Sequence, residues 1–125
     1  MIIVPNTLYS HNHHNNNLEN VYKHLRNKQF SKAINELKNL SDKNKPEAQL
    51  LYSKILYSGE ITTQDFEMSY FWANTSKLGG LKKSSNIISK LDDLIDEENK
   101  LKINENIKIF LNKSALTGDK LAIIQ

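Results

Sequence analysis

Apolar residues recur at helical spacing along the chain from Leu18 onward. Residues three and four apart lie on the same face of an α-helix, so this spacing predicts amphipathic helices. A short break at 27–29 separates the first two, whose apolar positions are Leu18, Val21, Tyr22 and Leu25, then Phe30, Ala33, Ile34, Leu37 and Leu40. We expect these two helices to pack antiparallel, because the connection between them is short.

Two central helices follow after the polar stretch Ser41 to Lys45. The third helix is expected to begin at Pro46, because a proline in the first turn loses no intrahelical hydrogen bond. It is expected to end at Gly59, in the left-handed conformation that glycine tolerates. The fourth helix should run from about Gln64 to Leu78. Thr62 and Asp65 are expected to cap its start, and Gly79 and Gly80 are expected to end it.

The last third of the chain predicts two more helices, so the fold class is all-α with about six antiparallel helices. The fifth should start with the positions Ser84, Ile87, Ile88 and Leu91. The sixth is marked by Ile103, Ile107, Phe110, Leu111 and Ala115 and should close near Gly118 as a C-terminal capping helix. Between them, Asp96 to Asn99 are expected to form a polar turn. The domain boundaries that follow are a flexible Asn- and His-rich tail at 1–17, a helical repeat domain at 18–116 and a C-terminal tail at 117–125.

Composition fits one soluble helical domain and argues against several functions. The 125 residues are 38% hydrophobic, enough for one packed core. The net charge of +3 is modest and Arg26 is the only arginine among 17 basic residues, so no nucleic-acid partner is expected. Cysteine is absent, which excludes disulfides and thiolate chemistry. Pro5 interrupts the apolar run Ile2–Val4, so we expect no membrane span. A cytoplasmic location and export after removal of a signal sequence both stay open.

An internal repeat emerges when the sequence is shifted by 36 positions. The shift aligns residues of both helix types: Phe30 with Phe66, Ala33 with Ser69, Ala48 with Ser84, Leu51 with Ile87, Tyr52 with Ile88 and Ile55 with Leu91. A period in the thirties with two helices per unit is typical of an α-solenoid, in which each helix pair buries its apolar face against the next pair. A short solenoid is therefore the expected architecture.

The best-marked unit, Ala48 to Gly80, resembles the Sel-one-like repeat, a relative of the tetratricopeptide repeat. The positions that carry the resemblance are Ala48, Gly59, Asp65, Ser69, Trp72 and Gly80, together with the long loop Ser58 to Thr63. The chain lacks the second loop glycine that usually precedes the position matched by Ile61. It also has Ser53, Ser76 and Lys77 where the family usually has alanine. The resemblance implies a degenerate repeat before this unit and capping helices after it.

Candidate chemical sites in the sequence are weak. His11, His13 and His14, with His24 more distant, are a potential metal set, but their Asn-rich flanks give no rigid frame. The run Gly79 to Ser85 lacks the lysine spacing of a phosphate-binding loop. The acids between Asp92 and Glu98 lack calcium-loop spacing, so we interpret them as a turn that favours the next helix start. We therefore expect no metal, cofactor or catalytic site.

Partner binding is the remaining expectation. Proteins that resemble this family use the groove of their stacked helices as an adaptor surface, which implies a protein or peptide partner. Polar residues on the first helix of each pair are the expected contacts, because solenoids expose that side. Trp72 is expected in the core. The candidate partner-binding residues are Lys23, Gln49, Lys54, Tyr70 and Phe71. The alternative is a structural subunit built stably into a larger complex.

Overall fold

The computed structural model describes residues 18–124, and within that range all regular secondary structure is helical, which confirms the all-α prediction. It contains six α-helices and one 3-10 turn: α2 (Glu19–Arg26), α3 (Phe30–Asp42), α4 (Pro46–Ser58), α5 (Phe66–Leu78), η2 (Lys82–Ser84), α6 (Ser85–Asp92) and α7 (Glu97–Ile124). The predicted tail at 1–17, with His11, His13 and His14, lies outside the described residues.

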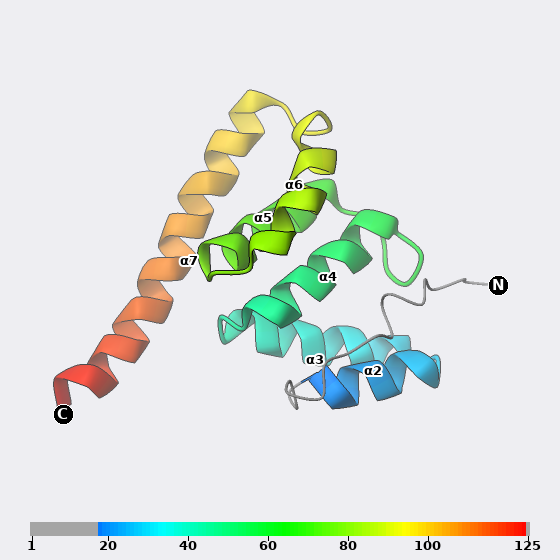
Figure 1. Ribbon diagram of the computed structural model, residues 1–125, viewed down its shortest axis with the longest axis horizontal. Helices are drawn as coiled ribbons and strands as arrows, with labels where there is room; N and C mark the ends of the chain where they lie inside the picture. Colours follow the sequence, from blue (N-terminus) through cyan, green and yellow to red (C-terminus); the bar gives the residue numbers. More distant parts are fainter. Residues whose placement is uncertain (1–17, 125) are drawn as a thin grey trace.

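Successive helices from α2 to α6 reverse direction, and each packs against its neighbours in sequence (Figure 1). Two apolar clusters fill the spaces between them. The first joins α2, α3, α4 and Trp72 of α5. The second joins α4, α5, α6 and the inner face of α7. Because α4 and α5 contribute to both clusters, this helix pair is the centre of the molecule.

The local signals at the ends of α4 and α5 act as the sequence predicts, with one correction. Pro46 is the first residue of α4, and Gly59 ends it at a φ of 69°. α5 begins at Phe66 rather than near Gln64, and Asp65 alone is its N-cap, its carboxylate accepting the Met68 N–H at 3.0 Å. Gln64 instead donates its side-chain amide to the Tyr57 carbonyl, so it belongs to the loop.

The 36-residue shift also relates the helix boundaries. α3 begins at Phe30 and ends at Asp42, and α5 begins at Phe66 and ends at Leu78, which are the positions that the shift pairs. The start of α4 at Pro46 corresponds in the same way to the start of η2 at Lys82. Ala33 and Ser69, which the shift aligns, are both fully buried.

Small residues bring α4 and α5 close together. The Ser53 hydroxyl donates to the Ser69 carbonyl at 2.7 Å, and the Ser69 hydroxyl donates to the Ser53 carbonyl at 2.8 Å. Both serines are fully buried, so these positions accept no larger side chain. At the far end of the pair, a Cβ added to Gly79 would lie 2.7 Å from Cγ of Pro46, which is too close. Glycine is needed there for space, since its φ of −77° suits any residue.

The last helix corrects the sequence prediction at both ends. α7 begins at Glu97, so the turn occupies 93–96 and the predicted turn residues Glu97 to Asn99 form the first helical turn. Asp96 precedes the helix and accepts the Asn99 N–H at 2.8 Å. The helix continues through Gly118 to Ile124, because a single glycine inside a helix costs only about 1 kcal/mol and does not stop it. α7 crosses α5 at an angle, as Figure 1 shows.

Candidate partner-binding groove

Three aromatic rings meet where α7 crosses α5. Phe71 and Trp72 of α5 stand edge to face, with ring centroids 4.7 Å apart. Phe110 of α7 lies edge-on to both, at 5.8 Å from Phe71 and 5.3 Å from Trp72. Edge-to-face contacts are favourable because the positive edge of one ring meets the negative face of another. This aromatic trio fixes the distance between the two helices at the middle of the molecule.

A hollow of about 590 Å³ opens beside the trio, and we call it the α5–α7 groove. Its floor is apolar and comes from both helices: Met68, Phe71, Trp72, Ile103 and Phe110. Met68 is 42% exposed and lines the hollow together with partly buried Phe71 and Phe110. The volume is within the range of about 300–1,000 Å³ typical of small-ligand pockets. The groove therefore offers apolar contact area that no part of the described chain fills.

The charged residues lining the groove are all carboxylates. Asp42 is the last residue of α3, Asp65 is the N-cap of α5 and Glu67 lies in the first turn of α5. Acids favour a helix N-terminus, because they accept its free amides and complement its dipole, which explains Asp65 and Glu67. Burial raises the pKa of Tyr52, and the nearby charges of Asp65 and Asp42 raise it further. Asp65 and Asp42 thus lie close enough to Tyr52 for their charges to act on its hydroxyl.

A second hollow continues along α7 toward its C-terminal half. It has a volume of about 830 Å³ and shares Asp42 and Phe110 with the groove. Its other lining residues come from the α3–α4 turn and from α7: Lys43, Asn44, Leu111, Lys113, Ser114 and Ala115. Basic and acidic groups are mixed here, so the purely acidic lining is confined to the α5 end.

Of the five residues predicted to bind a partner, only Phe71 lines the groove. Gln49 is fully buried and Tyr70 is 7% exposed, so neither side chain can reach a partner in this conformation. The Gln49 amide donates to the Ser41 carbonyl and to Oδ1 of Asn44, both at 3.0 Å. Gln49 therefore fastens the α3–α4 turn from inside, which corrects its predicted place on the surface.

The two predicted lysines are exposed but lie outside both hollows. Lys23 is on the outer face of α2. Lys54 is on α4, where partial burial of its amine and the charge of Lys83 lower its pKa, while Glu47 opposes that effect. Glu47 of α4 pairs with Lys83 of η2 at 3.3 Å. The surface around Lys54 therefore lies where α4 meets η2.

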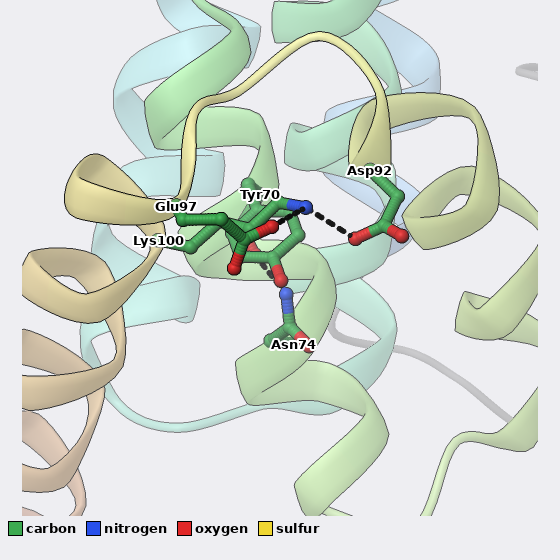
Figure 2. A network of polar contacts seen from close by, with 5 residues as sticks. All are labelled: Tyr70, Asn74, Asp92, Glu97 and Lys100. Atoms are coloured by element: carbon green, nitrogen blue, oxygen red, sulfur yellow. Dashed lines mark hydrogen bonds and ion pairs between the residues drawn. The ribbon is translucent and has the colours of Figure 1, made fainter.

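The acidic stretch after α6 forms a structural network. The Lys100 ammonium lies between Asp92 at 2.8 Å and Glu97 at 3.2 Å, and its side chain is only 12% exposed (Figure 2). The hydrogen bond to Asp92 raises the pKa of Lys100. Nearby, Asn74 donates to the carbonyl of Tyr70 at 2.9 Å. The network ties the end of α6 to the first turn of α7.

The other candidate sites have structural roles where the chain is described. His24 contacts Gln29 at 3.0 Å and Glu36 at 3.6 Å. Ser84, in the run that resembled a phosphate loop, is buried and hydrogen-bonded to Ser76 at 2.6 Å. Within residues 18–124 no group of three or more His, Asp or Glu side chains is arranged to hold a metal ion. Over the same range, no helix has both the length and the apolar character to cross a membrane.

Sequence reasoning missed the residues that make the groove distinctive, Met68, Asp42 and Phe110. Met68 and Phe110 both stand at helical spacing with other apolar residues, but this spacing does not indicate which face of α5 the last helix covers. Comparison with protein-family models, curated proteins and solved structures yields no match to this chain, so its function must be argued from this geometry.

Proposed function

We propose that this chain is a short helical-repeat module, similar to Sel-one-like repeats, that binds a partner protein or peptide in the α5–α7 groove. The observation that carries the proposal is the apolar floor of the groove, with Met68 exposed beside partly buried Phe71 and Phe110. Aromatic and methionine side chains are enriched where proteins bind one another. The proposed role is binding without catalysis.

The repeat architecture is supported by three features. The 36-residue shift relates the boundaries of α3 and α5. Among the positions that carry the family resemblance, Gly59 and Gly80 have positive φ and Trp72 is buried. From α2 to α6, successive helices pack on their sequence neighbours, as in a solenoid, while α7 packs on α5.

A pair of matched variants tests the binding role. Peptides selected by display against the wild-type chain should bind Met68→Ser about fivefold or more weakly, because truncating an interface anchor typically costs over about 1 kcal/mol. Leu78→Ser is the control: Leu78 is also exposed, at 66%, but lies at the end of α5 outside the groove. Selection of no peptide, or equal binding to both variants, contradicts the proposal.

A structural-subunit role is the second candidate, and the outer face of α7 favours it. Leu101, Ile109 and Leu116 are exposed by 68%, 53% and 64%, and they lie within one side of the helix, opposite buried Ile103 and Ile107. A terminal helix of a repeat protein normally has a polar outer face. If this role is correct, the isolated chain should self-associate in size-exclusion chromatography with light scattering, and Leu101→Glu should restore a monomer.

A further inference from the structure

The chemistry of the groove indicates what kind of segment it binds. The chain carries a net charge of +3, yet the charged residues that line the groove within the described part of the chain are Asp42, Asp65 and Glu67, with no basic residue among them. Among the described residues, no Lys, Arg or His forms an ion pair with any of these three carboxylates. Three carboxylates without an ion-pair partner among the described residues, next to exposed apolar surface, favour a cationic ligand by charge complementarity; Lys43 and Lys113 line only the neighbouring hollow.

We propose that the occupant of the α5–α7 groove is a short amphipathic peptide segment with a large apolar side chain flanked by Lys or Arg; this inference rests on the proposed binding function. The apolar side chain packs between Met68 and Phe110, and the basic side chains face Asp42 and Glu67. An amphipathic helix placed in a groove is a common mode of peptide recognition, in which the apolar face is buried and the rim sets the charge preference.

The position of each acid supports this arrangement. Asp65 already accepts the Met68 N–H with one carboxylate oxygen, so part of its accepting capacity is used. Asp42 and Glu67 accept no side-chain hydrogen bond from another described residue, and both are exposed, so they can approach a basic side chain without losing a contact within the described part of the chain. Charge attraction at this exposure depends on ionic strength, because the screening length falls from about 10 Å at 0.1 M salt to about 3 Å at 1 M.

Three synthetic peptides of equal length provide the test, measured by fluorescence anisotropy at low and high salt. The first is helical with a Leu stripe flanked by Lys, the second replaces each Lys with Glu, and the third keeps Lys but replaces Leu with Ser. The first peptide should bind about tenfold or more tightly than either of the others, and high salt should reduce that advantage. Equal binding of the first and third peptides would mean charge attraction alone and would overturn the inference.

Charge reversal on the protein identifies the site. Glu67→Lys should weaken binding of the Lys peptide about tenfold, and the double variant Asp42→Lys with Glu67→Lys should prefer the Glu peptide. Asp93→Lys makes the same change in net charge at an exposed position in the α6–α7 turn, outside the groove, and should bind like the wild type. Circular dichroism of each variant verifies that it is folded. An equal effect of Glu67→Lys and Asp93→Lys would overturn the inference.

The inference and the proposed function can fail separately. If display selection yields peptides that depend on Met68 but carry no excess of Lys or Arg, binding in the groove stands and the cationic preference is wrong. If no peptide, selected or synthetic, shows Met68-dependent binding, both are wrong.

Discussion

The ring of Phe110 lies edge-on to the indole of Trp72, with centroids 5.3 Å apart and planes at 87°. The two residues come from α7 and α5, 38 positions apart in the sequence (110 − 72), and their contact defines one end of the groove floor. Trp72 is the only tryptophan of the chain, so its fluorescence reports on this contact directly. Changes in the packing of α7 against α5 should therefore change the fluorescence of Trp72.

Phe110→Ala should lower the free energy of unfolding by roughly 2 kcal/mol. A fully buried Phe loses about 3–5 kcal/mol on truncation to Ala, and Phe110 is only partly buried. Urea unfolding followed by Trp72 fluorescence measures the change, and a quencher should reach Trp72 more easily in the variant. Ile109→Ala is the control, since Ile109 is 53% exposed on the other side of α7. Equal losses in both variants would show that the aromatic contact contributes nothing.

Ser53→Val should destabilise the protein by about 1–3 kcal/mol, because overpacking of a tight interface forces helices apart. Ser53 is fully buried against Ser69, and each hydroxyl donates to the other's carbonyl. Ser53→Ala should cost about 1 kcal/mol, the typical value of one hydrogen bond, because Ser69 keeps its bond to the residue 53 carbonyl. Thermal unfolding of both variants gives the comparison. A valine variant as stable as the alanine variant would contradict close packing of α4 on α5.

Alkaline conditions should destabilise the folded chain through Tyr52. Burial, Asp65 and Asp42 raise its pKa above the ordinary 10.0, so the group contributes stability that is complete below pH 10 and is lost as pH rises through the raised pKa. Tyr52→Phe removes the ionisable hydroxyl, so its unfolding free energy should fall less steeply above pH 10. The raised pKa values of Tyr22 and Lys100 also make the unfolding free energy fall as pH rises, so Tyr52→Phe keeps part of this pH dependence. The lowered pKa of Lys54 has the opposite effect and partly offsets it. Parallel stability curves for the two proteins would refute this role of Tyr52.

Gly79→Ala should destabilise the protein even though its backbone conformation suits alanine. The new Cβ would lie 2.7 Å from Cγ of Pro46, and relief of such a contact typically costs about 1–3 kcal/mol. Replacing Pro46 with Ala removes that Cγ, so the double variant should recover most of the loss caused by Gly79→Ala. Unfolding free energies of the two single variants and the double variant measure the coupling. Additive effects would mean that the two residues do not meet.

Local signals made much of the fold predictable from sequence. Pro46, Gly59 and Asp65 act within a few residues of their own positions, so their roles at helix ends follow from residue type. Trp72 was predicted in the core from its helical spacing together with the family resemblance. Residue type gave the wrong prediction at Glu97 and Glu98, which form the first turn of α7. Acidic residues are favoured in the first turn of a helix and are also common in polar turns, so residue type does not distinguish the two.

The candidate site was less predictable, for two physical reasons. Gln49 is polar but buried, because the Ser41 carbonyl and Asn44 satisfy its amide, so polarity wrongly indicated exposure. Met68 and Phe110 come together only because α7 crosses α5 at a particular angle. Periodicity identifies the apolar face of a helix, but it does not determine which neighbour that face meets.

The two walls of the groove are held in different ways. The α4–α5 pair is joined near mid-helix by Ser53 and Ser69 and at one end by the close approach of Pro46 and Gly79, so its helices cannot slide or pivot against each other. α7 is anchored in its N-terminal half, where Ile103 and Ile107 are buried and Lys100 binds Asp92. Rotation of α7 away from α5 would therefore have to expose Ile103 and Ile107 and separate Phe110 from Trp72, whereas the contacts inside the α4–α5 pair would stay as they are.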